Sequence, residues 1–152
     1  MKTFTKQAAT MLMTALLATW ATAAVADNWW RMDCELSSYA APYNGGPALE
    51  VAKSWMPPTS THVLRSGRSY HVEYGVSGSV EAPPGRIIIR YPLYDENGVR
   101  SVVKYTYLPR KNIFIASMYG GMGHNVRYYD MSARGTCQVS KIAEAVAKQL
   151  MR

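Results

Sequence analysis

The sequence predicts a mainly β protein: a small antiparallel β-sandwich or open barrel of about eight short strands with one C-terminal α-helix. Three features predict this class. They are a central β-hairpin, several short alternating segments that end at glycine or proline, and a last segment with helical spacing. Residues 1–26 differ from the rest in composition, and residues 27–152 are enough for a single domain with its own core.

The central hairpin covers Arg86–Leu108, where two runs rich in Ile, Val and Tyr flank the turn residues 95–98. A three-residue loop over 96–98 makes one face of the hairpin uniformly apolar, whereas a two-residue loop mixes polar groups into that face. We therefore expect the longer loop, with Gly98 in the left-handed position of a G1 bulge. The pairs in this register are Ile87–Tyr107, Ile89–Tyr105 and Tyr91–Val103.

The opposite face of the hairpin is basic. In the same register Arg90 stands opposite Lys104, and Arg86 and Arg100 lie along the same side. Such a face is either simply solvated or a patch that meets an acidic partner. Pro92 interrupts the first run, and because proline has no ladder donor it predicts a strand edge or a bulge there.

The amino-terminal segment has the form of a secretory signal peptide. Lys2 and Lys6 precede an uncharged apolar stretch over 8–21, and Ala24–Ala26 supplies an A-x-A cleavage site before Asp27. After residue 26 no apolar run approaches the roughly 20 residues of a membrane-spanning helix. The expected mature product is a soluble, exported domain over 27–152, located in the periplasm or, alternatively, secreted into the medium.

The two cysteines, Cys34 and Cys137, lie near opposite ends of the expected mature domain. An even number of cysteines in an oxidising compartment predicts one disulfide. Removing Lys2 and Lys6 lowers the formal net charge from +7 to +5. This excess favours acidic partners, but without a clustered Lys/Arg tract it argues against nucleic acid.

The other elements follow from local patterns. The remaining strands are expected at Asn28–Leu36, Thr61–Leu64, Arg68–Val76, Ile113–Met118, Val126–Met131 and Thr136–Val139. Residues 48–56 are assigned to a strand, with a short helical turn as the alternative. The helix is expected over Lys141–Met151, with Ser140 as its N-cap and an Ile142, Val146 and Leu150 stripe on the sheet.

Catalytic signatures are missing from the sequence. The three histidines, His62, His71 and His124, have no partner at zinc-ligand spacing, and no G-x-S-x-G elbow is present. We expect His62 and His71 to be satisfied residues at the surface or rim of the fold. The prediction is therefore a protein that is not an enzyme and has no resident cofactor. A cell-wall hydrolase with an unfamiliar arrangement of carboxylates or His124 is an alternative.

A second alternative comes from the glycine-rich segment 119–125. Met118, Met122, His124 and Met131 surround it, and thioethers with an imidazole form a ligand set that suits Cu(I). These four residues would make the chain a periplasmic copper-binding protein. The competing interpretation is an ordinary hairpin tip flanked by core methionines.

The leading hypothesis is an exported, non-enzymatic binding protein. Its partner would be an envelope protein, which it assists or inhibits, or an anionic envelope polymer. Tyrosine and tryptophan are enriched at recognition surfaces, and all 11 tyrosines lie after residue 26. The residues expected to form the partner-binding surface are Trp29, Arg86, Arg90, Arg100, Lys104 and Tyr128.

Overall fold

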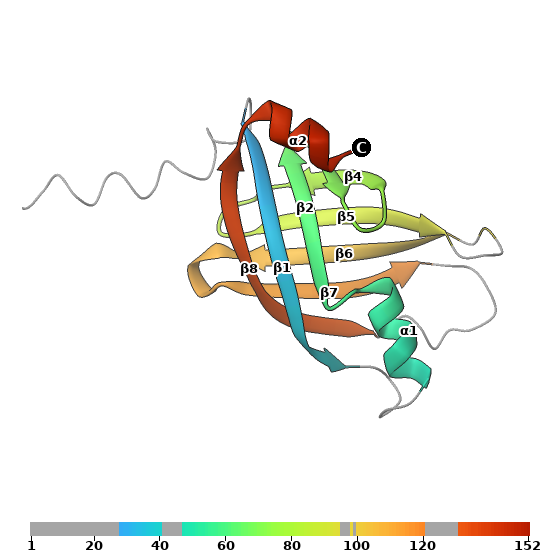
Figure 1. Cartoon of the computed structure of the whole chain (residues 1–152). Helices are drawn as coiled ribbons and strands as arrows, with labels where there is room; N and C mark the ends of the chain where they lie inside the picture. The colour runs from blue at the N-terminus through green and yellow to red at the C-terminus, as the bar shows by residue number, and fades with distance from the viewer. Residues whose placement is uncertain (1–27, 41–46, 95–97, 99, 121–130) are drawn as a thin grey trace, which may run out of the picture.

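In the computed structural model eight antiparallel strands close into a barrel (Figure 1). The structure describes residues 28–40, 47–94, 98, 100–120 and 131–152. The strands are β1 (Trp29–Ala40), β2 (Thr59–Arg65), β3 (Arg68–His71), β4 (Val76–Glu81), β5 (Ile87–Tyr94), β6 (Arg100–Leu108), β7 (Ile113–Gly120) and β8 (Ser132–Ile142). The helices are α1 (Pro47–Trp55), the 3₁₀ turn η1 (Pro109–Lys111) and α2 (Glu144–Leu150). The predicted class, a small mainly β fold with a C-terminal helix, is confirmed.

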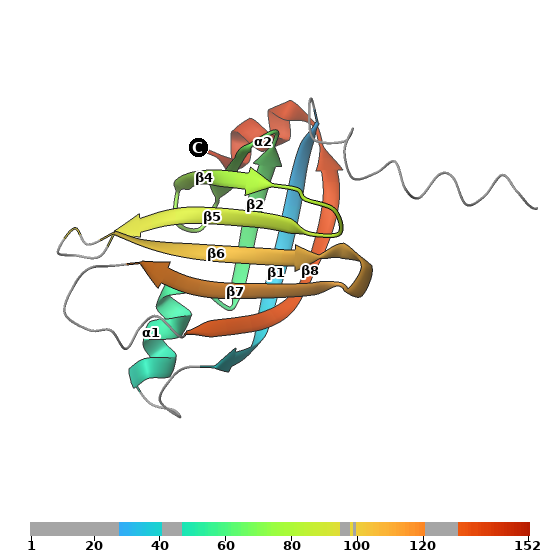
Figure 2. The same ribbon diagram turned by 180° about the vertical axis from the view of Figure 1, so that it is seen from behind.

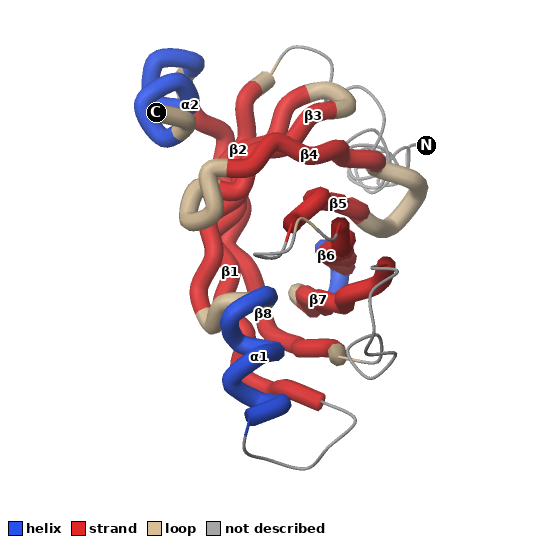
Figure 3. Tube along the Cα trace, turned by 90° about the vertical axis from the view of Figure 1, so that its right-hand side faces the viewer, coloured by secondary structure: helices blue, strands red, loops and turns tan. Residues whose placement is uncertain are grey.

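Each strand pairs with its neighbours in chain order, and β8 returns to pair with β1. Strands β4–β7 run across the direction of β1, β2 and β8, so the barrel has two crossed walls (Figure 2). The helices α1 and α2 lie at different ends of the barrel (Figure 3). This arrangement leaves the outer side of β5 and β6 uncovered by either helix.

The closing seam between β1 and β8 carries the predicted disulfide. Alternation along β1 buries Met32, Cys34 and Leu36, as the sequence predicts. Cys34 stands directly opposite Cys137 on β8, and the two are bonded. A register shift follows Leu36, where Gly135 lies so close to β1 that an added Cβ would fall 1.7 Å from the Glu35 carbonyl oxygen. Only glycine allows that approach.

The central hairpin has the predicted register. Ile87 pairs with Tyr107, Ile89 with Tyr105, Tyr91 with Val103, and Arg90 with Lys104. Gly98 has the expected positive φ, +75°, and residues 95–97 and 99 of the turn lie outside the described residues. The expectation for Pro92 is also confirmed, because β4 pairs with β5 only up to Arg90, so β5 is a local edge at Pro92.

The strand assigned to residues 48–56 is wrong, and the helical alternative is right. Pro47 begins α1, as suits a residue without a free N–H, and Pro57 follows its end. Ala52 and Met56 are fully buried, and their four-residue spacing places them on one helical face. The Tyr39 hydroxyl donates to the Met56 carbonyl at 2.7 Å, which ties the helix to β1.

Two further segments differ from expectation. The strand expected over Arg68–Val76 ends at His71, and a turn with Gly75 at φ +62° leads into the unpredicted β4. At the C-terminus, the β1–β8 ladder extends to Ile142, which takes Ser140 and Lys141 into the strand and starts α2 at Glu144. Val146 is therefore 41% exposed, and Ala147 is the residue that α2 buries.

Of the strand expected at Val126–Met131, residues 126–130 lie outside the described residues.

Candidate functional site

The four basic residues predicted on the hairpin share the outer side of β5 and β6. We call Arg86, Arg90, Arg100 and Lys104 the basic face. The neighbours of Arg90 and Lys104 along each strand are fully buried, so these two side chains point outward. Arg86 and Arg100 are exposed. The barrel thus presents a positive outer surface on adjacent strands.

Among the described residues, one carboxylate pairs with the basic face. Arg90 Nη1 contacts Glu81 Oε1 on β4 at 2.7 Å, and this is the ion pair that the described residues provide to the four basic side chains. The Glu81 side chain is 59% exposed, so the pair is weak in free energy. Arg134 on β8 is also exposed, beside the outer edge of β7, where it pairs with Ile115. An acidic ligand would therefore meet an attractive field here.

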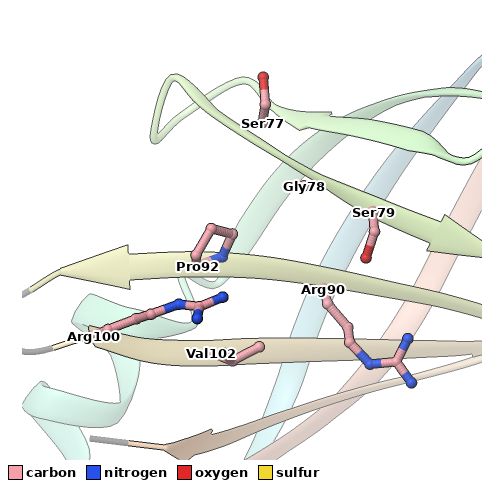
Figure 4. A pocket seen from close by; sticks show the side chains of 7 residues that line it. All are labelled: Ser77, Gly78, Ser79, Arg90, Pro92, Arg100 and Val102. Atoms are coloured by element: carbon pink, nitrogen blue, oxygen red, sulfur yellow. The ribbon is translucent and has the colours of Figure 1, made fainter.

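A groove opens beside the basic face, where β4 and β5 separate. Its volume is about 430 Å³. It is lined by Ser77, Gly78, Ser79, Arg90, Pro92, Arg100 and Val102 (Figure 4). In Figure 4, Arg100 extends from β6 toward Pro92, and Arg90 reaches from β5 across β6. Two guanidinium groups thus flank an apolar floor formed by Pro92 and Val102.

The interior of the barrel holds a second group of residues, which consists of histidines and aromatic side chains. His62, His71, Tyr91, Tyr105 and Phe114 are fully buried, and we call them the interior cluster. The two imidazole rings meet edge to face with centroids 4.8 Å apart, and the Tyr105 and Phe114 rings stack at 5.1 Å. The expectation of rim histidines is wrong, because closure of the barrel turns the Ser69–His71 side of β3 inward and leaves Tyr70 half-buried.

Hydrogen bonds satisfy most of the buried imidazole nitrogens. The His62 ring contacts the Tyr91 hydroxyl through Nδ1 and the Ser60 hydroxyl through Nε2, each at 3.0 Å. His71 Nε2 lies 3.3 Å from the Tyr105 hydroxyl. Its Nδ1 is 3.2 Å from Glu73 Oε2, but without the geometry of a hydrogen bond. Glu73 instead accepts from the Thr61 backbone N–H at 2.9 Å.

Burial keeps both histidines neutral at neutral pH. It lowers the pKa of His71 to about 4. For His62, burial first and the neighbouring His71 second hold the pKa well below its ordinary value. Glu73 would favour a charged His71, but its carboxylate is partly exposed and already holds the Thr61 N–H, so burial has the larger effect. Burial likewise raises the pKa of Tyr91 and Tyr105.

His62 of the interior cluster contacts the Ser60 hydroxyl, and nucleophilic catalysis uses serine–histidine contacts of this kind. However, Ser60 is only 2% exposed and His62 is fully buried, so a substrate would have to enter the packed interior to reach the Ser60 hydroxyl. The contact therefore fits the satisfaction of a buried imidazole better than it fits catalysis. The hydrolase alternative gains no residue from it.

The copper hypothesis remains a prediction. Met118 and Met131 are buried in the core, and the Met118 N–H donates to the Met131 carbonyl at 3.3 Å. Met122 and His124 lie outside the described residues. Within the part of the chain that the structure describes, no group of three or more His, Cys, Asp or Glu side chains is arranged to hold a metal ion.

Of the two aromatic residues expected at the partner-binding surface, the structure describes Trp29, and it lies away from the basic face. Trp29 begins β1, which pairs with β2 and β8, and its half-buried ring stacks under the Arg65 guanidinium at 4.9 Å. Tyr128 lies outside the described residues. The groove residues Ser77, Ser79 and Val102 were missed by sequence reasoning. Gly75 and the Ser77-Gly78-Ser79 sequence were the available signals of a turn followed by another strand.

Comparison of the chain with protein-family models, curated protein sequences and solved structures found no match. Among the described residues, no helix is long and apolar enough to cross a membrane. The Cys34–Cys137 disulfide indicates an oxidising compartment of the kind that exported proteins occupy. These findings leave the geometry of the outer surface as the basis for assigning a function.

Proposed function

We propose that this chain is an exported, non-enzymatic binding protein of the periplasm that holds an acidic partner on the basic face. The observation that carries the proposal is the placement of Arg86, Arg90, Arg100 and Lys104 on one wall of a closed barrel that neither helix covers. A covalently closed scaffold keeps these charges in fixed positions, which reduces the entropy lost on binding.

The partner classes are an envelope protein, which this chain assists or inhibits, and an anionic envelope polymer. Both present carboxylate or phosphate groups, and guanidinium groups bind these through paired hydrogen bonds. The like charges of Arg90 and Lys104, directly opposite one another, disfavour the free protein slightly. An acidic ligand would relieve that repulsion, which is a reason for the pair to be useful in binding.

The experiment uses two soluble polyanions, oligoglutamate and polygalacturonate, with binding followed by fluorescence anisotropy on residues 27–152. We expect at least one polymer to bind, and the Arg90→Glu/Lys104→Glu double variant to bind it at least about tenfold more weakly, ~1.4 kcal/mol. Added salt should also weaken binding, because the contacts are exposed charges.

The matched control is Arg110→Glu/Lys111→Glu, which makes the same change of charge on the exposed turn η1. If this control weakens binding as much as the variant on the basic face does, the net charge of the protein is responsible and the proposed site is wrong. Failure of both polymers to bind the wild-type protein would remove the proposal altogether.

A further inference from the structure

The groove between β4 and β5 supports a more specific hypothesis about the ligand than the charge of the basic face does. We infer that it receives an extended acidic segment of a protein partner, with one carboxylate held between Arg90 and Arg100. This inference rests on the proposed function, and it adds the chemical class of the ligand and the place where it anchors. Three features of the groove support a polypeptide as its occupant.

The first feature is the backbone of β4. The Val80 N–H donates to the Gly67 carbonyl at 3.3 Å, so the main chain of Val80 faces away from β5. In an antiparallel ladder successive residues face opposite neighbours, so the N–H and C=O of Ser79 and Ser77 face β5. The Ser79–Arg90 pair is the last that β4 and β5 make. Ser77 therefore presents its peptide groups to the groove.

The second feature is Pro92, which explains why the strands separate there. Continuing the register from Ser79–Arg90 would place Pro92 opposite Ser77. Proline has no N–H to donate, so this pair could not complete the ladder. At Gly78 the two strands still approach closely, since an added Cβ would lie 2.2 Å from the Arg90 carbonyl oxygen. Beyond that close approach, a strand edge is free to pair with another chain.

The third feature is the combination of an apolar floor with charged walls. Pro92 and Val102 are half-buried on the outer side of adjacent strands, and Tyr94 next to them is 63% exposed. The methylene groups of a glutamate or aspartate side chain can pack on this floor while its carboxylate meets the guanidinium groups. No described carboxylate forms an ion pair with Arg100, so none of them competes with a ligand for its charge.

The test combines backbone amide shifts in NMR with two groove variants, using a short oligoglutamate peptide as the probe. We expect the peptide to shift the amides of Ser77, Gly78 and Leu93 more than those elsewhere on the outer wall. Val102→Trp fills the groove without changing charge and should weaken peptide binding at least about tenfold. Thr106→Trp, on the same strand and the same face, should bind within about twofold of wild type.

Three other outcomes of this test would overturn the inference about the groove. If the peptide binds but Val102→Trp binds equally well, the basic face acts without the groove, and only the present inference fails. If polygalacturonate shifts the groove amides and binds more tightly than the peptide, the occupant is a glycan and the polypeptide assignment is overturned. If neither polymer binds the wild-type protein, the proposed function fails together with this inference.

Discussion

The two faces of the β5–β6 hairpin differ in what they do for the protein. On the inner face Tyr91 and Tyr105 are fully buried and contact His62 and His71. On the outer face, one residue along each strand, Arg90 and Lys104 point to solvent. The same strands therefore carry the residues that stabilise the barrel and the residues proposed to bind a partner.

This comparison shows how burial separates stability from recognition. A change on the inner face removes packing and leaves polar groups without partners, and both effects cost free energy. A change on the outer face alters charges that water already screens. We therefore expect substitutions inside the barrel to change the free energy of unfolding strongly and electrostatic binding only slightly. Substitutions on the outer face should change binding strongly and the free energy of unfolding only slightly.

The largest loss of stability should follow removal of the disulfide beside the core. Cys34→Ala/Cys137→Ala should reduce the free energy of unfolding by about 4–5 kcal/mol in the chain-entropy model, because the bond joins residues 103 apart. Urea unfolding under oxidising conditions measures this loss. Reductant should destabilise the wild-type protein and leave the double variant unchanged, and equal responses in the two proteins would contradict the prediction.

The next largest effect should come from the interior cluster. Tyr105→Ala removes a fully buried ring that stacks on Phe114 and contacts His71, and it should cost about 3–5 kcal/mol. Thr106→Ala is the matched control, since it changes the next residue on the same strand and the opposite face. That control should remain within about 0.5 kcal/mol of wild type in urea unfolding. Similar losses in the two variants would remove the distinction between the faces.

Acid should weaken the inner face while the outer charges stay in place. The folded pKa of His71, about 4, lies below its unfolded value of 6.5, so the unfolded state binds more protons between these values. The stability that neutral His71 contributes is complete above about pH 6.5. It is lost as the pH falls toward 4, by an amount on the order of 3 kcal/mol.

His71→Gln tests this dependence, because glutamine keeps a polar group but does not titrate. Urea unfolding of both proteins at several pH values gives the difference in their free energies of unfolding. That difference should shrink as the pH falls through the stated window. A difference that stays constant with pH would show that the buried histidine does not couple folding to protons.

The smallest effect on stability should come from Lys104, which directly precedes Tyr105. Lys104→Ala should change the free energy of unfolding by less than about 0.5 kcal/mol, while it weakens oligoglutamate binding measurably. Thermal unfolding and anisotropy on the same sample provide the two measurements. A loss of stability comparable with that of Tyr105→Ala would show that the outer face is part of the scaffold.

Several elements were predictable because local rules determine them. The alternation of Ile and Tyr with Arg and Lys fixes which side of the hairpin is buried, and Gly98 accommodates the turn that this register needs. Cys34 lies on the apolar side of its strand, so its burial followed from the same pattern. The basic face is a direct consequence of the hairpin register and was therefore predictable as well.

Helix α1 and strand β4 were not predictable in the same way. Ala48–Met56 contains apolar residues that suit either period, and packing of Ala52 and Met56 against the barrel selects the helix. The turn after His71 divides what looked like one alternating strand. Once it does so, Ser77 and Ser79 come to lie beside β5, which is how the groove arises.

By itself, the sequence determined the β class, the disulfide and the basic side of the hairpin, because each depends on spacing within a short stretch or on a single covalent pair. Only the tertiary structure decided that His62 and His71 face inward, that the barrel closes, and that β4 separates from β5 at Pro92. Those outcomes depend on which strands become neighbours. Pairing between distant strands is set by the free energy of the whole core rather than by any local pattern.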